Sequence, residues 1–174
     1  IKAAAEQYED IISLRPNATR AYASLGALYP NDPEKRRDIY QRGIDANKKD
    51  QSLNLVLASD YELANQFNEA IKIYEIILVN DPSNELAANN LAAVLLDFQS
   101  DSKSFERALK LARQFEDSDQ AAFLDTLGWA YYRNGDYGNA IRLLEAAVEN
   151  DDKFAQLHYH LGMAFVKAEM PGRG

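Results

Sequence analysis

The 174-residue sequence contains no cysteine, and only two histidines, two methionines and one tryptophan. Without cysteine the chain forms neither disulfides nor thiolate metal sites, and this absence fits a reducing or an oxidising compartment equally. No run of about 18 apolar residues is present, so we expect no direct membrane insertion. Basic residues are outnumbered by acidic ones, and the formal net charge is −8.

The acidic excess lies in the later part of the chain. Residues 1–60 carry 9 basic and 9 acidic side chains, whereas residues 61–174 carry 10 basic and 18 acidic ones. A protein that binds a nucleic-acid backbone or an anionic membrane needs a basic footprint. We therefore expect no nucleic-acid partner, and a solvated acidic surface accounts for the charge.

Residues 123–147 contain the pattern around which the chain is organised. On each side of the breaker Asn134–Asp136, apolar or small residues recur at i, i+3, i+4 and i+7, which is one face of an α-helix. They are Leu124, Leu127, Gly128 and Tyr131 before the breaker, and Ala140, Leu143, Leu144 and Ala147 after it. The small residues Gly128 and Ala140 let two backbones approach closely, so the segment predicts an antiparallel helix hairpin.

The hairpin pattern recurs along the chain with a period near 34 residues. Gly128 corresponds to Gly26, Ala58, Ala92 and Gly162, and successive members of this series are 32 to 36 residues apart. Tyr131 corresponds in the same way to Tyr29, Tyr61, Leu95 and Phe165, and Pro16 and Pro82 stand at matching unit ends. A small residue, a tyrosine, a second small residue and a closing proline at this period resemble the tetratricopeptide repeat family over nearly the whole chain.

The resemblance implies an all-α fold, a right-handed α-solenoid of about ten helices in one domain over residues 1–174. The predicted units are a half repeat (1–18, second helix), full repeats at 19–50, 51–84, 85–120 and 121–154, and a half repeat (155–170, first helix). Two irregularities are expected: a long turn at 97–104 within the third full repeat, and Arg36 where other repeats have a small residue. Asp32 and Pro33 predict a helix N-cap and first helical residue.

The repeat register also predicts a groove. Residues one position beyond the inward-facing ones point about 100° away, toward the concave side of the stack. With their polar neighbours, the predicted protein-binding residues are Asn89, Asn90, Ala93, Leu96, Asp125, Trp129, Tyr132, Arg133, Tyr159 and Met163. Aromatic anchors ringed by hydrogen-bonding groups are typical of protein-binding surfaces. Two alternatives stay open: that these residues pack against a neighbouring repeat, and that the convex face binds instead.

Nothing in the sequence indicates chemistry. His158 and His160 are two positions apart, so on a helix they point in different directions and cannot chelate one ion. His158 is expected to pack in the core, in register with Leu124. The acidic pair Asp151 and Asp152 falls at a helix end, and no serine has a base at a recognisable spacing. We predict no catalytic, cofactor or metal site, and hence no enzyme.

Family members that hold chaperone C-termini use a clamp of Lys, Asn and Arg on successive first helices. Here the corresponding positions are occupied by Ala23, Ala27, Leu55, Ser59, Asn89 and Ala93. The basic residues are absent, so such a clamp is not expected. The segments 124–137 and 158–163 look like late repeats of large bacterial multi-repeat proteins, including ones linked to exopolysaccharide export and the cell envelope. This favours a bacterial periplasmic or envelope protein, with the cytoplasm also consistent.

The two ends suggest a piece of a larger arrangement. The chain starts at Ile1 with no leader, which is expected of an excised or processed piece, and the opening helix, with an inward stripe of Ala4, Tyr8 and Ile11, lacks its hairpin partner. In the closing helix Leu157, Leu161 and Phe165 are expected to lie uncovered before Pro171 and Gly172 break the chain. Such ends predict continuation in a longer chain or head-to-tail self-association.

The sequence therefore predicts a non-catalytic scaffold that binds a partner peptide or protein segment in its concave groove, within a larger bacterial assembly. The alternatives are a regulatory or docking segment of an envelope polysaccharide or glycosyl-transfer machine, and a head-to-tail self-assembling repeat.

Overall fold

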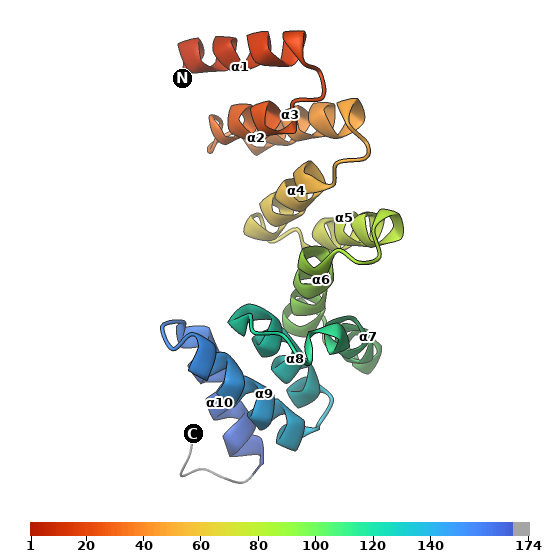
Figure 1. The fold of residues 1–174 in the computed structure, drawn as a ribbon, viewed down its shortest axis with the longest axis vertical. Helices are drawn as coiled ribbons and strands as arrows, with labels where there is room; N and C mark the ends of the chain where they lie inside the picture. The colour runs from red at the N-terminus through yellow and green to blue at the C-terminus, as the bar shows by residue number, and fades with distance from the viewer. Residues whose placement is uncertain (169–174) are drawn as a thin grey trace. The chain divides into compact units, whose positions relative to one another are not determined.

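A computed structural model describes residues 1–168, which form ten α-helices, one 3₁₀ turn and no strand (Figure 1). The helices are α1 (Lys2–Leu14), α2 (Thr19–Ala27), α3 (Pro33–Ala46), α4 (Ser52–Leu63), α5 (Phe67–Asn80), α6 (Glu85–Phe98), α7 (Ser102–Ala112), α8 (Ala121–Arg133), α9 (Tyr137–Asn150) and α10 (Ala155–Lys167). The 3₁₀ turn is η1 (Arg113–Phe115). The all-α prediction is confirmed; the chain break predicted at Pro171 lies outside the described residues.

The helices belong to two compact units, residues 1–87 and 88–174. In the first unit α2 packs on α3 and α4 on α5, while α1 lies against α2 and α4 against α2 and α3. In the second unit α8 packs on α9, α7 lies against α8, and α10 contacts both α8 and α9. Each unit thus contains helix hairpins that bury their apolar faces on neighbouring helices.

Small residues let the paired helices approach closely, as the sequence predicts. A Cβ placed on Gly26 would lie 2.2 Å from Cε1 of Tyr40, whose ring fills the space between α2 and α3. A Cβ on Gly128 would lie 2.7 Å from Cγ of Leu144. Tyr40 and Leu144 are buried, so neither ring nor side chain can swing into solvent to make room.

Two of the hairpin turns have the same backbone conformation. Asn65 and Gly135 adopt left-handed φ angles of 57° and 85° at the ends of α4 and α8. The next amide donates to the carbonyl five residues earlier in each turn: Gln66 N–H to the Tyr61 carbonyl at 2.8 Å, and Asp136 N–H to the Tyr131 carbonyl at 3.0 Å. This Schellman arrangement ends each first helix and reverses the chain.

Three expectations about packing faces were wrong. In α1 Tyr8 packs against the core as predicted, but Ala5 and Ile12 accompany it in place of Ala4 and Ile11, and Ile11 is 43% exposed. In α10 Leu157 and Phe165 are buried rather than uncovered, because α10 packs on both α8 and α9. His158 is exposed, and its neighbour His160 is the histidine packed in the core.

The long turn predicted at 97–104 is also shorter in the structure. α6 continues to Phe98 and α7 already begins at Ser102. Asp101 caps α7 by accepting from the backbone N–H of Ser104 at 3.0 Å and from its hydroxyl at 2.7 Å. The extra residues therefore extend helices, and η1 replaces the last predicted turn of the second helix. The predicted cap at Asp32 is confirmed, with Pro33 as the first helical residue.

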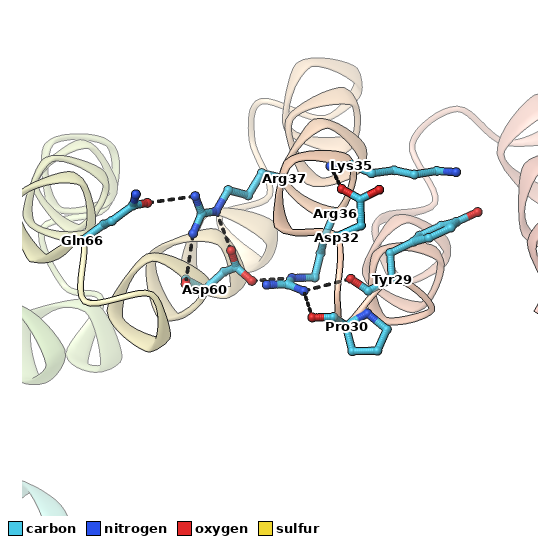
Figure 2. A network of polar contacts seen from close by, with 8 residues as sticks. All are labelled: Tyr29, Pro30, Asp32, Lys35, Arg36, Arg37, Asp60 and Gln66. Carbon is cyan, nitrogen blue, oxygen red and sulfur yellow. Dashed lines mark hydrogen bonds and ion pairs between the residues drawn. The ribbon is translucent and has the colours of Figure 1, made fainter.

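Arg36, the irregular residue of the first full repeat, belongs to a polar network between α3 and α4 (Figure 2). Its Nε donates to Oδ1 of Asp60, and its Nη1 donates to the carbonyls of Tyr29 and Pro30, each at 2.9 Å. Arg37 donates to Oδ2 of Asp60 at 2.6 Å. Asp60 is 6% exposed, so two guanidinium groups compensate one buried carboxylate. A long side chain thus replaces small-residue packing with hydrogen bonds to the preceding turn and the next helix.

The contact at Gly26 generates a stability prediction. Gly26→Ala should lower the free energy of unfolding by about 1–3 kcal/mol, because the added methyl overlaps the buried ring of Tyr40. Gly138→Ala is the matched control, since a Cβ there has its nearest neighbour at 3.9 Å. Urea denaturation followed by circular dichroism measures both. Equal stability of the two variants would contradict the close-approach argument.

A second prediction concerns Glu62, which accepts a hydrogen bond from the hydroxyl of buried Tyr74. Burial raises the pKa of the Glu62 carboxyl above its usual value, and the bond from Tyr74 opposes that shift. A carboxyl with a raised pKa stabilises the fold at low pH and loses this contribution as the pH rises through its folded-state pKa. Glu62→Gln keeps an acceptor for Tyr74 without a charge. Its melting temperature relative to wild type should therefore be higher at pH 7 than at pH 4, whereas the exposed control Glu6→Gln should show no such trend.

Candidate functional site: a cavity in the second unit

A cavity of about 490 Å³ opens in the second unit on the side of the first helices of successive hairpins. It is lined by Asn89 and Ala93 of α6, Gln120–Ala122, Asp125 and Thr126 at the start of α8, and Asp151 and Phe154–Leu157 leading into α10. No residue of α7 or α9 lines it. We call this space the unit 2 cavity.

Asn89 lines the unit 2 cavity, and its carboxamide oxygen, Oδ1, is a buried acceptor without a donor in the described part of the chain. Its Nδ2 donates to Oδ1 of Asn90 at 3.3 Å, which fixes the orientation of the carboxamide. A buried carbonyl without a donor costs about 1–3 kcal/mol of stability.

Asp125 is held by a buried histidine. Oδ1 of Asp125 lies 2.8 Å from Nδ1 of His160, and the two residues are 7% and 4% exposed. An ionised carboxylate only accepts hydrogen bonds, so Nδ1 carries the donated hydrogen. This contact joins α8 to α10 and fixes Asp125, which also lines the unit 2 cavity.

An aromatic cluster lies behind this pair. Trp129 stacks on His160 with ring centroids 4.1 Å apart and on Tyr132 with centroids 4.4 Å apart. Its indole N–H donates to Oδ1 of Asp97 at 3.0 Å, and Tyr159 lies tilted against it at 6.5 Å. Partial burial raises the pKa of the Tyr132 hydroxyl above its usual value. The cluster therefore fixes α6, α8 and α10 relative to one another around the cavity.

Arg133 contacts neighbouring helices and does not line the cavity. Its guanidinium lies 4.0 Å from the ring centroid of Phe105 and donates to the carbonyl of Leu96 near the end of α6. That carbonyl belongs to the last turn of the helix, where intrahelical donors run out. Arg133 thus caps α6 and packs against α7.

The ten predicted groove residues separate into groups. Asn89, Ala93 and Asp125 line the unit 2 cavity. Leu96 is fully buried and is not available to a partner from this position, which corrects its assignment to the groove. The others lie outside the cavity lining: Asn90 beside Asn89, Trp129, Tyr132 and Tyr159 in the aromatic cluster, Arg133 at the end of α6, and half-buried Met163 on α10.

Sequence reasoning missed two features of the site. The segment before α10 contributes Phe154, which is 63% exposed, and Gln156 to the cavity wall. His160 was missed because the repeat register places His158 in line with Leu124, and the partner of His160 lies 35 residues earlier. The signal available was Leu157, His160 and Ala164, whose i, i+3, i+7 spacing marks the buried stripe of α10.

The described residues present acceptors and apolar surface at the cavity rather than reactive groups. No set of three or more His, Asp and Glu side chains within residues 1–168 is arranged to hold a metal ion. Among the described helices, none combines the length and apolar character that a membrane span requires.

The chain is similar to known proteins that contain tetratricopeptide repeats. Residues 126–169 match a family model described as tetratricopeptide repeat. A TPR repeat-containing protein of Pseudomonas aeruginosa is 29% identical over 124 residues, which make up 71% of this chain and 21% of the relative. These two matches identify a tetratricopeptide repeat within residues 126–169. The chain spans about a fifth of the length of that relative.

Solved structures share the tetratricopeptide fold over nearly the whole chain. MamA from Desulfovibrio magneticus has a TM-score of 0.71 at 19% identity, covering 97% of this chain and 88% of its own. YrrB, described as a TPR protein with an unusual peptide-binding site, has 0.74 at 17% identity, covering 97% and 87%. BtubC from P. vanneervenii has 0.74 at 19% identity, covering 99% and 83%. The predicted solenoid of helix hairpins is confirmed. The predicted likeness to proteins of exopolysaccharide export is not tested by these structures and stays a prediction.

The unsatisfied oxygen of Asn89 generates a stability prediction. Asn89→Leu should raise the free energy of unfolding by about 1 kcal/mol, because it removes a buried acceptor that has no donor. Leu55 occupies the corresponding position of an earlier tetratricopeptide repeat, so leucine suits this helix face.

Thermal and urea unfolding measure the effect of Asn89→Leu. Asn150→Leu is the matched control: the Nδ2 of Asn150 donates to the Asp119 carbonyl at 3.0 Å, so this change should lower stability or leave it unaltered. A destabilised Asn89→Leu variant would show that the oxygen has a partner in solution.

Proposed function

We propose that the chain is a non-catalytic protein–protein interaction scaffold that binds a peptide segment of a partner in the unit 2 cavity. The observation that carries this proposal is the open cavity that α6, the start of α8 and the segment leading into α10 line, with Asn89, Gln120 and Thr126 among its polar residues. A peptide backbone supplies N–H donors at regular spacing, and the exposed ring of Phe154 offers apolar contact beside them.

Two further points support a binding role over a purely structural one. The groups around the cavity are held in place by the Asp125–His160 contact and by the stacking of Trp129, so little ordering is needed when a ligand binds. YrrB, whose fold is similar, is described as having an unusual peptide-binding site, and this likeness supports a binding role.

The proposed scaffold acts within a larger bacterial assembly. The much greater length of the Pseudomonas aeruginosa relative supports a second candidate, in which these repeats are a docking segment of a longer protein. Both candidates use the same cavity, so a test of peptide binding addresses them together.

The test is to select peptides from a random display library on the purified chain and to titrate a selected peptide by calorimetry. Ala122 is exposed and lines the unit 2 cavity, so Ala122→Trp places an indole at its opening. We expect Ala122→Trp to weaken binding by about tenfold or more, since the indole fills the opening that the peptide must enter.

Lys110→Trp is the control, because Lys110 is exposed on α7 and lies outside the cavity lining. Circular dichroism confirms that both variants melt like wild type. Equal binding by wild type and Ala122→Trp would place the binding surface elsewhere, and failure of any peptide to be selected would argue against the scaffold role.

A further inference from the structure

We propose that the partner segment carries a proline-rich stretch, which docks on a group of tyrosines beside the unit 2 cavity. Tyr132, Tyr137 and Tyr159 make up this group, and we call it the tyrosine surface. The inference rests on the proposed peptide-binding function and names the class of peptide. It is carried by the free hydroxyls of the three tyrosines, by rings that no cation covers, and by their position on the helices that line the cavity.

The tyrosine surface is built on the buried ring of Trp129. Tyr132 stacks on that ring with centroids 4.4 Å apart, and Tyr159 lies tilted against it at 6.5 Å. Tyr137, at the start of α9, lies tilted against Tyr132 at 5.7 Å. Trp129 is 8% exposed, whereas Tyr159 is 60% exposed and the other two tyrosines are half-buried. Trp129 therefore supports the surface, and the tyrosines are the layer that a partner meets.

The three tyrosine hydroxyls are donors without an acceptor. Within residues 1–168 no hydrogen bond joins any of them to another residue. Burial, and then the hydroxyls of Tyr137 and Tyr159, raise the pKa of the Tyr132 hydroxyl, so the three hydroxyls lie near one another. Tyrosine hydroxyls are protonated at neutral pH and can donate. A ligand that fits this surface must bring acceptors.

Among the described residues, no cation lies over the rings of the tyrosine surface. In the first unit, by contrast, the ammonium of Lys35 lies 4.0 Å from the ring centroid of Tyr29. Arg133, whose guanidinium approaches the cluster, lies over Phe105 and donates to the Leu96 carbonyl. The outer faces of the three tyrosine rings are therefore available to an uncharged apolar group of a ligand.

A proline-rich segment matches both features. Proline has no N–H, so its backbone presents carbonyl acceptors without donors that would need partners. Such segments dock on aromatic-lined surfaces as preformed polyproline II helices. The same pairing occurs inside the chain, where the Tyr22 hydroxyl donates to the carbonyl of Pro16 at 3.1 Å. An ordinary segment would bring one N–H for each carbonyl, and a lysine side chain would bring donors only.

The tyrosine surface continues from the unit 2 cavity along two helices. On α8 Tyr132 lies seven positions after the cavity residue Asp125, and on α10 Tyr159 lies four positions after Ala155. Residues at these spacings share a helix face. Four residues of α-helix advance about 6 Å, which about two residues of polyproline II span. One extended peptide can therefore enter the cavity and place a proline-rich stretch over the tyrosines.

The experiment uses the whole chain and pools of fluorescein-labelled dodecapeptides in which every third residue is fixed as Pro, Ala or Lys. The other positions are mixed Ala, Leu, Ser and Gln. Because polyproline II has about three residues per turn, the fixed residues share one face of the peptide. Fluorescence anisotropy gives the affinity of each pool. We expect the Pro pool to bind about tenfold more tightly than the Ala and Lys pools.

Variants test the hydroxyls without removing the rings. The double variant Tyr132→Phe/Tyr159→Phe removes two donors that have no acceptor in the described chain, so it should melt like wild type. It should reduce the preference for Pro over Ala to about twofold or less, because two hydrogen bonds to the peptide are lost. Tyr29→Phe is the matched control: it removes the hydroxyl of a half-buried tyrosine in the first unit and should leave the preference unchanged. If the double variant and the control have equal effects, the inference fails.

The remaining outcomes separate this inference from the scaffold function. If the Pro and Ala pools bind equally and Ala122→Trp abolishes both, the scaffold function stands and the preference for proline is overturned. Tighter binding of the Lys pool than of the Pro pool overturns it as well. Binding of cellohexaose that Tyr159→Ala abolishes, without a preference for the Pro pool, would assign the surface to carbohydrate instead. If no pool binds the wild-type chain, the proposed function and this inference fail together.

Discussion

The close approach of two helices at a position without a side chain is the constraint on which the rest of the structure depends. At Gly26 and Gly128 the backbone of one helix lies against the side chain of its partner, with no space for a methyl group. This contact sets the rotation of each helix, and the rotation decides which residues face the core and which face the cavity. The residues that face the cavity therefore depend on the same packing that forms the hairpins.

The sequence was sufficient for the features that repeat and insufficient for those that depend on one neighbour. The period, the hairpins and the cap at Asp32 follow from local patterns that occur several times. The faces of α1 and α10 were misjudged by one or two positions, because these helices contain apolar residues on adjacent stripes. Only the packed neighbour selects between Ile11 and Ile12, or between His158 and His160.

Only some of the predicted groove residues line the cavity, because large polar and aromatic side chains contact partners that are distant in sequence. Trp129 bonds to Asp97 and stacks on His160, and Arg133 reaches the carbonyl of Leu96. A repeat register places these residues on one face, yet it does not show which of them are occupied by contacts between helices. Arg36 is a second example. It stands where other repeats have a small residue, and the sequence alone gives no partner for it. In the structure it donates two hydrogen bonds to the preceding turn and one to buried Asp60, so it connects neighbouring repeats.

Asn89 is the counterexample to this pattern of satisfied polar groups. Buried acceptors in folded chains are almost always paired, because an unpaired one costs stability. Asp60 and Asp125 both have partners, and Trp129 donates to Asp97. The oxygen of Asn89 has none among the described residues, although Asn89 itself lines the unit 2 cavity. A leucine at this position, as in an earlier repeat, would avoid the cost. An unpaired polar group among otherwise well-paired neighbours is a local conflict of the kind that folded proteins keep mainly at functional or strained positions.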